Sequence, residues 1–143
     1  MMTAHLNMVT LGTRDFDSMR DFYLRLGWQE NAAADCRFAN FHTGSSVLAL
    51  YPRSASADDE PILLTIDPDQ LLSSNLAVWV DDPTQVDLAI ESAREAGAEI
   101  LVEPRAAFWG GRSAYFSDPE GNVWEITWNP NAAALEPGGV YWA

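Results

Sequence analysis

The order of apolar segments in this chain is repeated, and this repetition limits the possible folds more than any other feature. A strand-like run, a helix-like segment that stops at Gly27, and further strand-like runs occupy residues 6–53. The same order returns from residue 75 onward, with Gly97 in the place of Gly27. A single module of one helix and one curled sheet cannot cover its own concave face. The repetition therefore predicts a tandem duplication.

Two segments have the apolar spacing of three and four residues that is typical of an amphipathic helix. The first is 16–26, which follows Asp15 as a candidate N-cap. The second follows Asp82, has Pro83 at its first helical position and stops at Gly97. One helix is therefore predicted in each half of the chain.

Short apolar runs separated by turn residues predict the strands. These runs are 6–11, 37–42, 47–51, 62–66, 75–80, 98–102, 113–116 and 123–128. Between the halves, residues 54–61 are small and acidic and end in proline, which is typical of a linker. The predicted organisation is a single domain, 1–143, with a first module at 5–53, a linker and short strand at 54–73, a second module at 74–130 and a C-terminal tail at 131–143.

A long segment near the C-terminus resembles a known family. The run from Phe108 to Glu125, FWGGRSAYFSDPEGNVWE, is similar to the last strands of the glyoxalase/bleomycin resistance/dioxygenase proteins, the vicinal oxygen chelate superfamily. Thr10-Leu11-Gly12 and Leu26-Gly27 resemble the first strand and helix of that family, and Asn129-Pro130 a poorly characterised bacterial subgroup. The resemblance implies an α+β fold, in which two tandem βαβββ modules form a curved eight-stranded sheet around a cavity, usually in a homodimer.

The resemblance also implies where metal-dependent relatives hold their ion. Those relatives place two ligands in each module, typically His on the first strand and Glu on the last, and the positions map here onto Met8, Ala49, Asn75 and Glu125. Only Glu125 is a charged, hard donor, whereas Met8 is a soft thioether and Ala49 has no donor. A catalytic zinc site needs about three protein ligands. We therefore expect no metal and no other cofactor.

Three roles are open for Glu125. As a structural carboxylate, it would accept hydrogen bonds from Asn75 or a buried hydroxyl. In an apolar cavity its pKa would rise, and it would act as a general acid or base. As an anchor, it would bind a cationic or hydrogen-bond-donating ligand. The sequence favours the anchor, because no second catalytic group is evident beside Glu125, with the structural role as a close alternative.

Further side chains are predicted to line the same cavity. Arg112 would clamp a carboxylate or phosphate beside Glu125, or would form a salt bridge on the surface. Phe108 and Trp109 precede two glycines and would form a mobile flap over the cavity mouth, or else pack in the core. The other residues of the predicted set are chosen because side chains alternate between the two faces of a strand, which predicts the residues that share the cavity face. The predicted ligand-binding residues are Met8, Thr10, Ala49, Asn75, Trp79, Phe108, Trp109, Arg112, Glu125 and Thr127, and the catalytic candidate is Glu125.

The balance of charge narrows the choice of partners. Eight basic and twenty-one acidic residues give a net charge of −13, which repels nucleic acid and anionic lipid. No apolar run approaches the roughly 18 residues of a membrane helix, and no export signal is evident. The single Cys36 excludes an internal disulfide. We therefore expect a cytoplasmic protein without nucleic-acid or membrane partners.

The predicted function is binding or sequestration of a small organic molecule without a metal, as in the antibiotic-binding members of the family that the chain resembles. Six Trp, six Phe and four Tyr suit a lined pocket for such a ligand. Two alternatives stay open. One is a glyoxalase- or isomerase-type lyase that uses Glu125 for proton transfer, and the other is an interaction module with a vestigial cavity.

Overall fold

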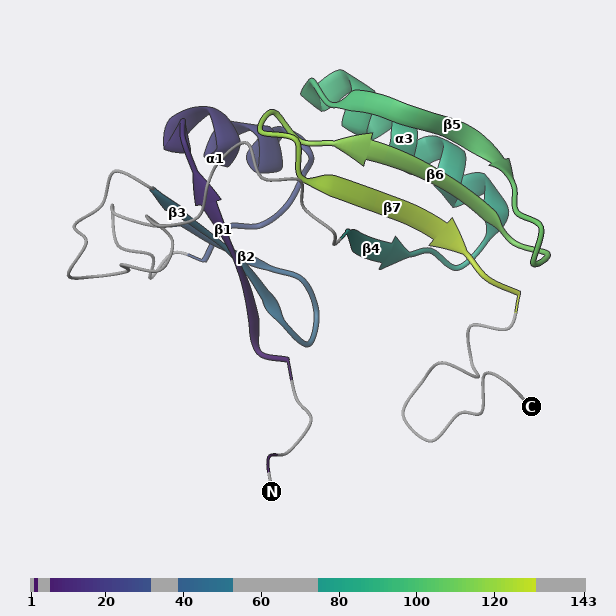
Figure 1. The fold of residues 1–143 in the computed structure, drawn as a ribbon, viewed down its shortest axis with the longest axis horizontal. Helices are drawn as coiled ribbons and strands as arrows, with labels where there is room; N and C mark the ends of the chain where they lie inside the picture. The colour runs from purple at the N-terminus through teal and green to yellow at the C-terminus, as the bar shows by residue number, and fades with distance from the viewer. Residues whose placement is uncertain (1, 3–5, 32–38, 53–74, 131–143) are drawn as a thin grey trace. The chain divides into compact units, whose positions relative to one another are not determined.

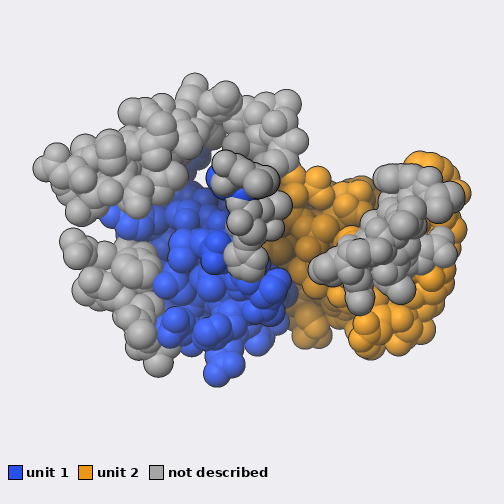
Figure 2. Space-filling model, turned by 90° about the horizontal axis from the view of Figure 1, so that it is seen from below, with its two compact units in different colours: residues 1–72 blue, residues 73–143 orange. Residues whose placement is uncertain are grey.

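The computed structural model describes residues 2, 6–31, 39–52 and 75–130. The chain divides into two compact units, Met1–Leu72 and Ser73–Ala143, which Figure 2 shows in different colours. The predicted strand at 62–66, its linker and the C-terminal tail lie outside the described residues. No helix within the described ranges is long and apolar enough to span a bilayer.

In the second unit, one helix packs on one face of a four-stranded sheet (Figure 1). Its elements are β4 (Leu76–Trp79), α3 (Pro83–Ala96), β5 (Glu99–Ala106), β6 (Arg112–Ser117) and β7 (Val123–Trp128). The strand order is β4-β7-β6-β5, with β4 parallel to β7 and the other neighbours antiparallel. This is a complete βαβββ module, in which the last strand lies beside the first.

The ends of α3 are as the sequence predicts. The Asp82 carboxylate accepts hydrogen bonds from the backbone N–H groups of Thr84 and Gln85, and the Gln85 side chain accepts from the backbone N–H of Asp82. This reciprocal capping box satisfies N–H groups that have no partner within the helix. Gly97 ends the helix in the left-handed conformation, with φ of 101°, which favours glycine.

The core of the second unit lies between α3 and the sheet. The buried helix residues recur at helical spacing, and the buried strand residues alternate. They are Val86, Ile90, Ala93, Ala96, Ala114, Phe116, Trp124 and Ile126. The rings of Phe116 and Trp124 stack with their centroids 6.3 Å apart. Because strand side chains alternate between faces, Tyr115 and Glu125 point to the face of the sheet that α3 does not cover.

The first unit has the same plan. Its elements are β1 (Met8–Thr13), α1 (Phe16–Arg25), β2 (Ala39–His42) and β3 (Val47–Pro52), and the strand order is β1-β3-β2, with β1 parallel to β3. Asp15 caps α1 by accepting a hydrogen bond from the Ser18 N–H at 3.0 Å. Helix α1 buries Met19, Phe22 and Tyr23 in the core that also contains Phe41, Leu48 and Leu50.

Strand register shows how closely the two units correspond. In each unit, one row of side chains runs from the first strand, across the last, to the strand before it. The corresponding rows are Thr10–Ala49–Asn40 in the first unit and Ala77–Glu125–Tyr115 in the second. Ala49 and Glu125 therefore occupy corresponding positions on the last strands of the two units. The α+β fold is therefore confirmed, and seven of the eight predicted strands are present within the described residues.

One strand pairing was missed by sequence reasoning. Glu30 bridges to Phe41 in antiparallel fashion, as Ile100 of β5 pairs with Phe116 in the second unit. Backbone hydrogen bonds from Asn31 N–H to the Asn40 carbonyl, 2.7 Å, and from His42 N–H to the Gln29 carbonyl, 3.1 Å, extend this contact. Residues 29–31 are polar and show no apolar alternation, so no strand was predicted there.

Candidate ligand-binding face

Two neighbouring rows of side chains cross the helix-free face of the second unit. The rows follow from the pairing of residues across all four strands, because residues that are directly paired on neighbouring strands point to the same side of the sheet. The rows are Ala77–Glu125–Tyr115–Val102 and Trp79–Thr127–Ser113–Arg105. As predicted, Trp79 and Thr127 share the face of Glu125. We call these two rows the Glu125 face.

Two side chains lie next to the Glu125 carboxylate. Asn75 Nδ2 donates a hydrogen bond to Glu125 Oε2 over 3.4 Å, and Tyr115 is paired with Glu125 across strands β6 and β7. Burial raises the pKa of Tyr115, and the charge of Glu125 raises it further, while Arg105 opposes them. Tyr115 therefore stays protonated at neutral pH and acts as a donor.

The rest of the Glu125 face combines an apolar edge with small hydroxyl groups. Trp79 lies on the edge strand β4 and is 48% exposed, whereas Ser113 and Thr127 are buried. An indole beside a carboxylate can stack on a flat ring or contact a cation. The face thus offers a charged acceptor, a phenol donor and an aromatic surface within two adjacent rows.

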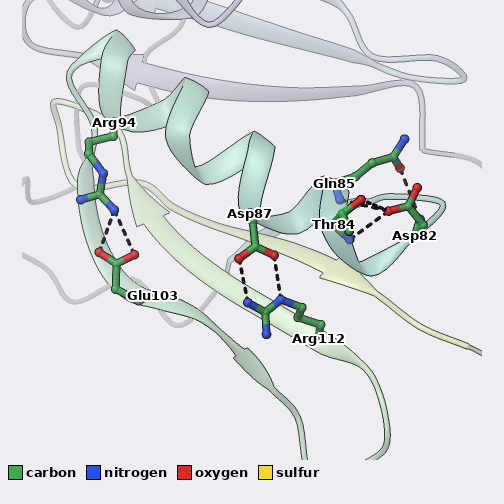
Figure 3. Close-up of polar contacts among 7 residues, drawn as sticks. All are labelled: Asp82, Thr84, Gln85, Asp87, Arg94, Glu103 and Arg112. Atoms are coloured by element: carbon green, nitrogen blue, oxygen red, sulfur yellow. Dashed lines mark hydrogen bonds and ion pairs between the residues drawn. The ribbon is translucent and has the colours of Figure 1, made fainter.

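Arg112 does not lie beside Glu125. Its Nε and Nη2 atoms donate to Asp87 Oδ2 and Oδ1 at 2.8 and 2.7 Å, and Asp87 belongs to α3 (Figure 3). Hydrogen bonding to Arg112 is the main cause that lowers the pKa of Asp87. The predicted anion clamp next to Glu125 therefore needs correction, because Arg112 is turned to the helix side of the sheet. The salt-bridge alternative is the one present.

The segment between β5 and β6 is a hydrogen-bonded turn. The Ala107 N–H donates to the Gly111 carbonyl at 2.9 Å, and Gly110 has φ of 97°. Phe108 is fully exposed, whereas the Trp109 ring lies directly against Gly111, where a Cβ would overlap it. A contact of Phe108 or Trp109 with a ligand stays a prediction, as does the motion of a flap.

The predicted residues of the first unit form a corresponding face. Register places Thr10 beside Ala49 on neighbouring strands, and Met8 lies two residues before Thr10 on the same side of β1. Met8 is 46% exposed and Thr10 is exposed, whereas Ala49 is buried. Whether these side chains contact a ligand stays a prediction.

The donor set does not fit the metal that the family resemblance implies. In the second unit, the two positions that the resemblance maps onto metal ligands carry one carboxylate, Glu125, and one neutral amide, Asn75, and these are hydrogen-bonded to each other. Across the described part of the chain, no group of three or more His, Cys, Asp or Glu residues is arranged to hold an ion. Since a catalytic zinc site needs about three such donors, these residues are a poor match for it.

Two polar residues beside the predicted set were missed. Tyr115 contacts Glu125, and Asn40 occupies the corresponding position in the first unit. Tyr115 had a signal in the sequence. Counting outward from the turn at 118–121 along the predicted hairpin places it opposite Glu125. For Asn40, the only indication in the sequence was the internal repeat, which is a weaker guide to strand pairing than a predicted hairpin.

Comparisons with known proteins agree with this architecture. A family model described as the Glyoxalase/Bleomycin resistance protein/Dioxygenase superfamily matches residues 5–126. No curated protein matches the chain significantly. Among solved structures, a glyoxalase-related enzyme from Fulvimarina pelagi is 26% identical with a TM-score of 0.79, covering 90% of this chain and 91% of that one. A glyoxalase/bleomycin resistance protein/dioxygenase family enzyme from Burkholderia phytofirmans PsJN is 27% identical with a TM-score of 0.76, covering 87% and 98%.

Proposed function

This chain belongs to the Glyoxalase/Bleomycin resistance protein/Dioxygenase superfamily, and from that premise we propose that it binds a small organic molecule on the Glu125 face without a metal. The observation that supports this most is the hydrogen bond from Asn75 Nδ2 to the Glu125 carboxylate, which lies directly across from the Tyr115 phenol. The Asn75 donor orients Glu125 as an acceptor, and among the described residues Glu125 belongs to no group of three or more His, Cys, Asp or Glu that could hold an ion.

The chemistry of this face favours a planar ligand with N–H donors, and a cation in particular. A carboxylate accepts two parallel N–H bonds from an amidinium group. Trp79, on the adjacent row, offers an aromatic surface for a ring or a cation. The net charge of −13 attracts cationic ligands at a distance.

Benzamidine is a suitable probe, because it joins an amidinium group to a flat ring. We expect saturable binding to the full chain by NMR titration, with shifts at Glu125, Tyr115 and Trp79. Glu125→Gln should weaken binding about tenfold or more, since it removes a charge-assisted hydrogen bond. Glu95→Gln, on the exposed surface of α3, removes the same charge and should leave binding unchanged.

Two results would contradict this proposal. One is equal affinity of the native chain and Glu125→Gln for benzamidine. The other is a stoichiometric divalent ion in protein purified without chelator, because a metal would then occupy the carboxylate. Absence of binding across a panel of planar cations would favour the interaction module.

The neighbouring Tyr115 supports a second candidate, an isomerase- or lyase-type proton transfer. Glu125 would remove a proton from a bound substrate, and the Tyr115 phenol would donate one. Glu125→Gln should then abolish turnover, and Tyr115→Phe should lower kcat more than it raises KM. An activity that survives Glu125→Gln would exclude this candidate.

A further inference from the structure

One arginine of the Glu125 face differs from the other arginines of the second unit. Arg94 and Arg112 each donate to a carboxylate over 2.7 Å. Arg105 is exposed, and its side chain forms no ion pair or hydrogen bond within the described residues. In a chain with eight basic and twenty-one acidic residues, an arginine without an acidic partner is unexpected. Its guanidinium is therefore available to a ligand.

Two independent observations place the Arg105 side chain on the same side of the sheet as Glu125. Arg105 pairs with Ser113, and Ser113 pairs with Thr127, so these three side chains share the helix-free face. Electrostatics agree with this register. Burial is the main cause that raises the pKa of Tyr115, and Arg105 acts against it, so the positive charge lies within range of the phenol.

The spacing of the two charges fits a flat molecule. Strand β6 separates β5 from β7, and Arg105 belongs to the row that lies two residues beyond Glu125. Neighbouring strands lie about 4.8 Å apart and residues rise about 3.4 Å along a strand, so the Cα atoms of the two residues are about 12 Å apart. Strand side chains stand roughly perpendicular to the sheet, so a gap of similar size separates the charged groups. A benzene ring with a hydrogen-bonding group at each end spans such a gap.

We propose that Arg105 determines the specificity of the Glu125 face, and that the ligand is a zwitterion with an N–H cation and a carboxylate at opposite ends of a flat ring. This role rests on the proposed function, because Glu125 anchors the cation. The Arg105 guanidinium donates two parallel N–H bonds to the carboxylate of the ligand. The ring lies over β6, and Trp79, on the far side of β7, flanks the cationic group.

The net charge of the chain makes this preference easy to recognise. At −13, the protein repels at long range the carboxylate that distinguishes a zwitterion from a simple cation. Tighter binding of the zwitterion therefore requires a positive group close to the site. Within the two rows of the Glu125 face, Arg105 is the basic residue.

Benzamidine and 4-amidinobenzoate are matched probes, because they differ only in the carboxylate. By NMR titration of the full chain, 4-amidinobenzoate should bind about three- to fivefold more tightly than benzamidine, as an exposed ion pair allows. Arg105→Gln should abolish or reverse this preference. Arg105→Lys should keep part of it, since an ammonium attracts a carboxylate without the paired geometry. Arg94→Gln, which removes the same charge from the last turn of α3, should keep all of it.

Two results would overturn the role of Arg105 alone. One is 4-amidinobenzoate binding to the native chain no more tightly than benzamidine, and the other is a preference that persists in Arg105→Gln. In both cases, benzamidine binding that is weakened by Glu125→Gln still supports the proposed function. The proposed function fails in a different way, when benzamidine binds the native chain and Glu125→Gln equally, and the role of Arg105 then fails with it.

Discussion

Tyr115 and Glu125 face each other directly across strands β6 and β7, and burial together with the charge of Glu125 raises the pKa of the Tyr115 phenol. In metal-dependent members of the family that the sequence resembles, the position of Glu125 holds an ion. Here, Asn75 Nδ2 donates to that carboxylate over 3.4 Å, and Tyr115 lies directly across from it.

The ionisation of Tyr115 should depend on Glu125. Burial raises the pKa of Tyr115 first, and the charge of Glu125 raises it next. Glu125→Gln should therefore bring this pKa closer to the ordinary value of about 10, without fully reaching it. An NMR titration of the Tyr115 ring, assigned with Tyr115→Phe, measures the shift, and Glu95→Gln is the charge control. An unchanged titration in Glu125→Gln would disprove the contact.

The same group predicts the alkaline dependence of stability. Because the pKa of Tyr115 is raised in the folded chain, the unfolded chain loses this proton first as pH rises. The contribution of Tyr115 is complete below the unfolded pKa of about 10 and is lost as pH rises through the folded pKa. Urea unfolding across this range should show a smaller decline in Tyr115→Phe than in the native chain.

Removing Asp87 should weaken the contact between α3 and β6. The Asp87 and Arg112 side chains are 48% and 31% exposed, so Asp87→Asn should lower the free energy of unfolding only slightly at neutral pH. Hydrogen bonding to Arg112 lowers the pKa of Asp87, so the stabilisation is present above its unfolded pKa and is lost as pH falls through the folded value. Urea unfolding at neutral and acidic pH should show the difference between the two chains shrinking in acid. A difference that is independent of pH would contradict this.

Gly111 should tolerate no side chain. A Cβ there would overlap the Trp109 ring and the Trp128 carbonyl oxygen. Gly111→Ala should therefore lower the free energy of unfolding by about 1–3 kcal/mol, as overpacking does. Adding Trp109→Ala should recover only part of this loss, since the carbonyl clash remains. Denaturant unfolding measures both, and full recovery in the double variant would mean that Trp128 moves freely.

A histidine at position 75 should increase the affinity of the chain for a transition-metal ion. The side chain at position 75 already reaches Glu125, with 3.4 Å between Asn75 Nδ2 and Glu125 Oε2. Asn75→His would place an imidazole beside this carboxylate, so Ni²⁺ or Zn²⁺ should bind more tightly than to the native chain. Calorimetric titration tests this, and Asn75→His with Glu125→Gln should lose the gain. Equal affinity in all three chains would mean that position 75 is not a ligand position.

Local signals in the sequence were sufficient for the helices. Asp15 and Asp82 cap α1 and α3 as predicted, and Gly97 ends α3, because caps act within one turn of the chain. Strand ends were less certain. Strand β5 runs to Ala106, well past the predicted end at 102. Antiparallel pairing with β6 supports these last residues, although shifts in the register disrupt the regular alternation of side chains from which a strand is predicted. The polar segment 29–31 pairs only because β2 supplies its partner.

What the sequence by itself determined was the repeated order of its helical and strand segments and the α+β class, because residue type and period are properties of the chain alone. Only the tertiary structure decided which side chains meet. Strand pairing brought Tyr115 to Glu125 and left Asn40 opposite the methyl group of Ala49, while α3 drew Arg112 away to Asp87. The physical reason is that a hydrogen bond or ion pair depends on ångström distances between strands, and these distances follow from register and from the side of the sheet that each helix covers.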